Sequence, residues 1–136
     1  MKVGVGGLLG NGVKGQVCPK VLVVEDEPLI RLDVASYLAE AGFTVCEAAD
    51  GEQALELLNC RDDIRAVFTD IEMPGSINGL DLAAVVRETW PDITVIVTSG
   101  RVRPNGELPE GADFFEKPYE LSRIVDRLSR IDGRNL

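Results

Sequence analysis

Four short stretches of this sequence end in side chains that could act on a phosphoryl group. They supply the acidic pair Glu25 and Asp26, the carboxylate of Asp70, the hydroxyl of Thr98 and the amine of Lys117. Each stretch begins with an apolar, β-branched run of the kind that forms a buried strand. A site built from carboxylates, one hydroxyl and one ammonium suits a hard cation together with a phosphoryl group.

The residue types also predict separate tasks within such a site. Aspartate forms acyl phosphates, so Asp70 can act as a nucleophile toward phosphorus. Lys117 would neutralise charge on the arriving phosphoryl group, and Thr98 would donate a hydrogen bond to it. Neighbouring carboxylates repel one another unless a cation lies among them. Since Mg²⁺ prefers a few carboxylates, retained waters and a phosphoryl oxygen, we expect Mg²⁺ as the cofactor.

These side chains need a fold that brings the ends of separate strands together. From Lys20 onward we expect five strands alternating with about five helices. This pattern predicts a flavodoxin-like, doubly wound α/β fold, with a five-stranded parallel sheet of order 2-1-3-4-5 and helices on both faces. The expected strands are 21–24, 43–48, 65–69, 93–97 and 113–116. The switch point then falls between the first and third strands, which carry Asp26 and Asp70.

Local signals indicate where the helices begin. Pro28 suits the first turn of a helix. Asp50 and Gln53 form a capping-box pattern, and Asn78 opens a third helix. Prolines and glycines in residues 100–112 leave room for one short helix at most, so we expect an irregular connection there.

Length and composition fit one globular domain: the chain has 136 residues, of which 45% are hydrophobic and 27% charged. The net charge of −9 argues against non-specific nucleic-acid binding, which needs Lys and Arg to neutralise phosphates. The chain has no histidine, which excludes Ser-His and Cys-His catalysis and histidine metal ligands. No run reaches the length of a transmembrane helix. The three cysteines lack metal-like spacing, so we expect a cytoplasmic protein with free thiols and no membrane partner.

Residues 1–19 differ from the rest of the chain because they hold six glycines and no acidic residue. Glycine at this density disfavours helices and strands, so we expect a disordered N-terminal tail. A leader peptide is the alternative, although glycines interrupt its apolar part. We assign residues 20–132 to a single domain and expect no output domain.

The four motifs together resemble the receiver domain of bacterial two-component response regulators. They are the acidic pair after the first strand, D-x-x-M-P-G from Asp70, the hydroxyl of Thr98 after the fourth strand, and K-P at Lys117. The resemblance covers roughly Lys20 to Arg130. Each motif alone is weak, but all four occur in order, each after its own strand.

The resemblance implies a role for each matching residue. Asp70 would be the phosphoacceptor. Asp26 would bind Mg²⁺ directly, with Asp70, and Glu25 would bind it directly or through water. The backbone carbonyl of Glu72 would be a further ligand. Thr98 would move toward the phosphoryl group after transfer.

Other implied roles concern the end of the sheet beside Thr98. Lys117 would pair with the phosphoryl group. Phe114 matches an aromatic position that changes rotamer in many receivers and would act with Thr98 as the switch. Pro118 matches a proline that often follows a cis peptide bond.

The sequence also departs from the usual receiver pattern near the site. Glu25 stands where aspartate is commoner. Ser99 replaces a frequent alanine and adds a hydroxyl near the site. Glu72 places an acid at a position that can influence phosphoryl lifetime. Because Phe114 lacks a tyrosine hydroxyl, any switch there would rest on packing.

The resemblance implies a stand-alone response regulator rather than an enzyme in the usual sense. Its phosphoryl donor would be a sensor histidine kinase or a histidine phosphotransfer protein. Its output would be contact with an unidentified protein target, as a monomer or as a dimer formed on phosphorylation. Two alternatives stay open. One is a degenerate receiver that serves as a binding scaffold; the other is an aspartyl-phosphate phosphatase, although the D-x-D start of the haloacid-dehalogenase kind is absent.

Overall fold

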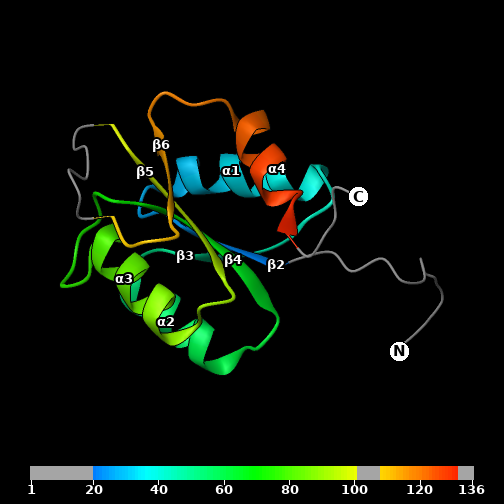
Figure 1. The fold of residues 1–136 in the computed structure, drawn as a ribbon. Helices are drawn as coiled ribbons and strands as arrows, with labels where there is room; N and C mark the ends of the chain where they lie inside the picture. Colours follow the sequence, from blue (N-terminus) through cyan, green and yellow to red (C-terminus); the bar gives the residue numbers. More distant parts are fainter. Residues whose placement is uncertain (1–19, 101–107, 132–136) are drawn as a thin grey trace.

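Four helices cover a parallel sheet in the computed structural model, which describes residues 20–100 and 108–131 (Figure 1). The five strands are β2 (Lys20–Val24), β3 (Thr44–Ala48), β4 (Ile64–Asp70), β5 (Thr94–Ser99) and β6 (Asp113–Glu116). The helices are α1 (Pro28–Glu40), α2 (Gly51–Cys60), α3 (Gly79–Thr89) and α4 (Leu121–Leu128). The strands lie in the order β3-β2-β4-β5-β6, and every pair is parallel. The predicted flavodoxin-like order is therefore confirmed.

The described residues contain four helices, one fewer than the five or so that were expected. The predicted tail, residues 1–19, lies outside these residues, as do positions 101–107 of the irregular connection. The described part of that connection, from Leu108 to Ala112, forms a turn and no helix. None of the helices in the described ranges has the length and apolar character needed to cross a membrane.

The structure confirms the three predicted helix starts, although the predicted capping box at Asp50 is incomplete. Pro28 occupies the first turn of α1. The side chain of Asp50 accepts a hydrogen bond from the Gln53 amide at 2.8 Å, but the Gln53 side chain accepts from Ala49 rather than from Asp50 itself. Asn78 forms a complete capping box with Asp81 at the start of α3. Each cap satisfies amides that the first helical turn leaves unpaired.

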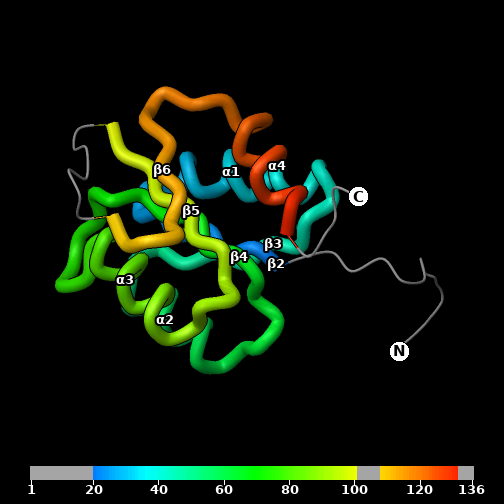
Figure 2. Tube along the Cα trace, viewed as in Figure 1, coloured from blue at the N-terminus to red at the C-terminus, as the bar shows by residue number. Residues whose placement is uncertain are grey.

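Two apolar layers fill the space between the sheet and its helices. Figure 2 shows α2 and α3 on one side of the sheet and α1 and α4 on the other. Side chains in a strand alternate between the two faces of the sheet. In β2, Leu22 contributes to the layer beneath α2 and α3, whereas Val23 contributes to the layer beneath α1 and α4. In β6, Phe114 packs against the first layer and Phe115 against the second. This alternation fixes the face on which each residue at the strand ends must lie.

Arg87 holds the turn before β6 against α3. Its guanidinium donates hydrogen bonds to the carbonyl oxygens of Glu110 (3.1 Å), Pro91 (2.9 Å) and Ile93 (3.2 Å). Gly111 in this turn has φ of +91°, a conformation that L side chains rarely adopt. One side chain thus anchors the segment that leads into β6 and on to Lys117.

Candidate functional site

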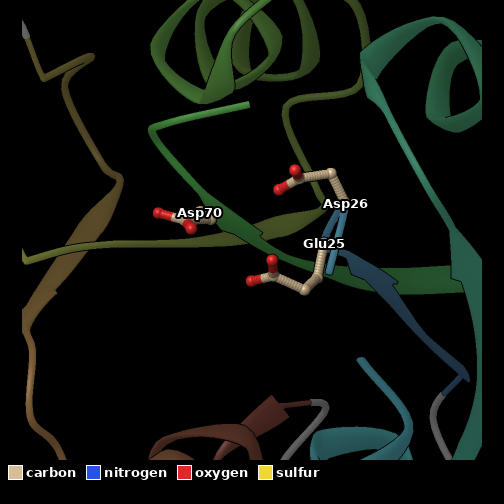
Figure 3. A group of neighbouring side chains, drawn as sticks. All are labelled: Glu25, Asp26 and Asp70. Atoms are coloured by element: carbon tan, nitrogen blue, oxygen red, sulfur yellow. The ribbon is translucent and has the colours of Figure 1, made fainter. Parts of the chain in front are cut away.

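An acidic cluster lies where β2 and β4 end, at the predicted switch point. Glu25, Asp26 and Asp70 each offer a carboxylate oxygen within 4.8 Å of the others. Glu25 and Asp26 diverge from the end of β2, and their carboxylate groups point to the side on which Asp70 lies (Figure 3). Glu25 and Asp70 are buried, whereas Asp26 is exposed. The arrangement gives a hard cation access from solvent on one side of a buried carboxylate pair.

The alternation of side chains along the strands explains why four of the predicted site residues converge. Glu25, Asp70, Thr98 and Lys117 each lie two positions after a side chain in the layer beneath α1 and α4. Those preceding side chains are, in the same order, Val23, Phe68, Ile96 and Phe115. Because side chains two apart share a face, all four groups are directed to the same side of the sheet edge.

The carboxylate of Asp70 is held at both oxygens. The Lys117 ammonium donates a hydrogen bond to Oδ2 at 3.0 Å, and the backbone amide of Glu72 donates to Oδ1 at 3.3 Å. The Asp70 side chain is 8% exposed and the Lys117 side chain 28%. The acid is therefore oriented by the protein while its cationic partner still reaches solvent.

Burial raises the pKa of Asp70 above its ordinary value of 3.8, although the hydrogen bond and charge of Lys117 oppose the rise. The nearby Glu72 carboxylate adds to it. The pKa of Glu25 is raised in the same way, first by burial and then by the charges of Asp70 and Asp26, against the Glu27 amide that donates to it. Both raised pKa values indicate that the site holds an excess of buried negative charge. A divalent cation bound among these carboxylates would remove that excess, so the donor set fits Mg²⁺.

Arg31 stabilises the end of β2, which leads into the acidic cluster. Its Nη1 donates to the carbonyl oxygen of Glu25 at 2.8 Å, and its Nε pairs with the Glu47 carboxylate at 3.2 Å. The start of α1 is thereby tied to both β2 and β3. Sequence reasoning did not identify Arg31, since it lies on a helix six residues after the acid it supports.

Thr98 and Asp70 are direct partners in the register of β4 and β5. Thr98 is 2% exposed, and its hydroxyl makes no hydrogen bond within the described residues. Its carbonyl oxygen accepts the amide of Ile71 at 2.8 Å. The hydroxyl is therefore buried beside Asp70 and available to a group bound there.

Gly79 allows the loop after β4 to pass close to Asp70. A Cβ at Gly79 would lie 2.1 Å from the carbonyl oxygen of Asp70, so any larger residue would displace the loop. The same loop carries Glu72, whose side chain accepts a hydrogen bond from Ser99 at 2.5 Å. Both residues stood out in the sequence as departures, but their contact was not predicted, because they lie 27 positions apart.

Phe114 and Pro118 lie beside the site rather than in it. Phe114 is half-buried and packs against the layer beneath α2 and α3, the face opposite to Thr98. The Lys117–Pro118 peptide bond is cis, as the receiver resemblance implies. The switch role of Phe114 and the Glu72 carbonyl as a metal ligand stay predictions.

The fold and this edge define a class: doubly wound α/β proteins with an aspartate-centred acidic site at the switch point. The sequence profile of the response regulator receiver domain matches residues 21–129. The chain therefore belongs to the response regulator receiver domain family.

Individual relatives agree with this assignment. A putative NtrX-like response regulator of Rickettsia conorii is 34% identical over 115 residues, which cover 81% of this chain and 24% of that protein. The receiver domain of NtrX from Brucella abortus aligns with a TM-score of 0.73 at 34% identity, covering 82% of this chain and 96% of that one. A response regulator receiver protein from Sinorhizobium medicae aligns with a TM-score of 0.78 at 28% identity, covering 84% and 94%. The chain thus spans about a quarter of the NtrX-like protein but nearly all of each isolated receiver.

Proposed function

We propose that this protein is a phosphoacceptor of two-component or phosphorelay signalling, and that Asp70 accepts the phosphoryl group. The observation that carries the proposal is the placement of Asp70 at the switch point. Its Oδ2 is 3.0 Å from the Lys117 ammonium, and Glu25 and Asp26 bring carboxylate oxygens within 4.8 Å. Membership of the receiver family supports the same residue assignment.

The reaction is a transfer from a phosphohistidine of a sensor histidine kinase or of a histidine phosphotransfer protein. An Asp70 carboxylate oxygen attacks the phosphorus, the P–N bond breaks, and the imidazole leaves with the bonding electron pair and takes up a proton from solvent. Lys117 stabilises the negative charge of the transferred group, and the Thr98 hydroxyl donates a hydrogen bond to it. The product is an aspartyl phosphate.

Glu25, Asp26 and Asp70 would hold Mg²⁺, together with the backbone carbonyl of Glu72. When bound, the ion neutralises charge on the carboxylates and on the phosphoryl oxygens. The protein's own contribution is to keep Asp70 fixed through Lys117 and the Glu72 amide. Output would follow from contact of the phosphorylated receiver with a protein target.

This proposal is tested by incubating the protein with a small acyl-phosphate donor, with and without Mg²⁺, and then measuring the intact-protein mass. We expect one phosphoryl adduct that requires Mg²⁺ and is absent from Asp70→Ala. The matched control is Asp63→Ala, which removes an exposed aspartate paired with Lys20 at 3.1 Å at the other edge of the sheet; it should still form the adduct. No adduct on the native chain would favour a binding scaffold, whereas steady hydrolysis of phosphate esters would favour a phosphatase.

A further inference from the structure

Four residues at the site edge form a closed chain of hydrogen bonds that joins three strands. The Glu72 amide donates to Asp70 Oδ1 (3.3 Å), and Ser99 Oγ donates to Glu72 Oε2 (2.5 Å). The Lys117 amide donates to the Ser99 carbonyl oxygen (2.9 Å), and Lys117 Nζ closes the chain at Asp70 Oδ2 (3.0 Å). Each oxygen of the Asp70 carboxylate is thus tied to the same ring of contacts.

Ser99 occupies a special place in this ring. Ser99 lies two positions after Val97, whose side chain belongs to the layer beneath α2 and α3. The Ser99 side chain therefore lies on the opposite face from that of Thr98. The Ser99 side chain thus points away from the Thr98 hydroxyl. Ser99 is 1% exposed, and its hydroxyl meets the partly buried Glu72 carboxylate there. A hydrogen bond to a charged acceptor in such a place is strong and geometrically restrictive.

We propose that Ser99 is a positioning residue for Asp70 and acts through Glu72; this inference rests on the proposed function. Ser99 tethers the Glu72 carboxylate to the end of β5 on the α2–α3 face. The tether keeps the negative charge of Glu72 from turning toward the arriving phosphoryl group. It also keeps the Glu72 amide against Asp70 Oδ1, which preserves the orientation of the attacking carboxylate.

The test is the rate of phosphoryl incorporation from a small acyl-phosphate donor at saturating Mg²⁺, followed by intact mass. Ser99→Ala should lower the maximal rate by about tenfold, because it removes the hydrogen bond that holds the charged Glu72 carboxylate. The Mg²⁺ concentration that gives half of the maximal rate should change much less. A purely structural role would instead lower the melting temperature and leave the maximal rate of the folded protein unchanged.

The chain offers a matched control in the same loop. Ser76 Oγ donates to the Glu52 carboxylate at 2.9 Å, so it makes a serine–glutamate bond of the same chemistry, but in an exposed position. It has no part in the ring of contacts at Asp70. Ser76→Ala should therefore keep the native rate, while Ser99→Ala loses it.

A double-mutant cycle shows whether Ser99 acts through Glu72. Ser99→Ala should cost about tenfold when Glu72 is present and nothing when it is added to Glu72→Ala. An equal loss in both backgrounds, or no loss in either, would overturn the inference while leaving Asp70 as the phosphoacceptor. If the native protein itself forms no adduct, the proposed function fails and the positioning role fails with it. Should Ser99→Ala not fold, Ser99→Cys, which keeps a small, weakly donating side chain, carries the same expectation of a slower maximal rate.

Discussion

The carboxyl and amino ends of the strands, called here the carboxyl edge and the amino edge of the sheet, each carry a lysine–aspartate pair. The two pairs have nearly the same length, but their aspartates differ in burial. At the carboxyl edge, Lys117 lies 3.0 Å from Asp70, whose side chain is 8% exposed. At the amino edge, Lys20 lies 3.1 Å from Asp63, whose side chain is 51% exposed. Burial raises the pKa of Asp70 in spite of its lysine. The hydrogen bonds of Arg61 and Lys20 lower the pKa of Asp63 to about 2.

A lysine–aspartate pair alone therefore does not make a functional site. Asp63 has solvent and two cationic partners, so its charge is fully satisfied. Asp70 is buried near the carboxylates of Glu72 and Glu25, so Lys117 compensates its negative charge only in part, and a further cation would be favourable. Poorly satisfied buried charge at a sheet switch point is a mark of function.

The largest expected contrast is in the rate of phosphorylation. Lys117→Met should slow phosphoryl incorporation by about a hundredfold, because a positioned cation stabilises the charge of the transferred group. Lys20→Met should react at the native rate. Time courses of intact mass with an acyl-phosphate donor measure both variants. Equal rates for the two variants would contradict the role of Lys117 in stabilising the transferred group.

Mg²⁺ should stabilise the protein through the carboxyl edge only. At a hundredfold excess over its dissociation constant, a ligand that binds the native state adds about 2.7 kcal/mol to the free energy of unfolding. We expect this gain for the native protein and for Asp63→Asn, but not for Asp26→Asn. Thermal denaturation with Mg²⁺ or with EDTA measures it. Retention of the full gain in Asp26→Asn would place the ion elsewhere.

The two edges should respond to pH with opposite signs when a chelator keeps metal away. The pKa of Asp63 is lower in the folded state than its ordinary 3.8, so its contribution is present above that value and is lost as the pH falls toward about 2. The pKa values of Asp70 and Glu25 are higher in the folded state. The folded state then binds more protons, so their contribution declines as the pH rises above the ordinary carboxyl range.

Free energies of unfolding from urea titrations across acidic and neutral pH test these signs. Asp63→Asn should reduce the loss of stability on the acidic side. Asp70→Asn should flatten the decline toward neutral pH. A steeper neutral decline in Asp70→Asn would contradict the raised pKa of Asp70.

The smallest expected effect is on stability at the amino edge. Lys20→Met removes one partner of an exposed aspartate that retains Arg61 at 3.2 Å. The Asp63 end of this pair is exposed to solvent, which screens the charges, so the pair contributes little net free energy. The denaturation midpoint at neutral pH should therefore equal that of the native protein within error. A clear fall in the midpoint would show that the Lys20–Asp63 pair contributes substantially to stability.

The sequence predicted the fold because the strands and three of the four helix starts in the described residues have a local signal. The buried β-branched runs of β2, β4 and β5 and the caps at Asp50 and Asn78 act over a few residues. The order of the strands follows from the right-handed crossovers. The convergence of Asp26 and Asp70 was predictable for the same reason, since both follow strands that flank the switch point.

Contacts between distant side chains could not be predicted in this way. The Ser99–Glu72 hydrogen bond depends on the path of the loop after β4, which Gly79 allows to approach Asp70. The bracing of β2 by Arg31 depends on how α1 lies against β3. The anchoring of the turn at Gly111 by Arg87 likewise joins segments with no shared sequence pattern.

The position of the phosphoryl group in the chain shows directly whether Asp70 is the phosphoacceptor. Borohydride reduces an aspartyl phosphate to homoserine, which survives digestion and marks the acceptor. Trypsin places the candidates on separate peptides: 21–31 holds Glu25 and Asp26, 62–65 holds Asp63, and 66–87 holds Asp70. We predict a Mg²⁺-dependent homoserine in peptide 66–87, at position 70 by fragmentation. Reduction at Asp26 or Asp63, or at Asp81 within the same peptide, would contradict the assignment of Asp70 as the phosphoacceptor.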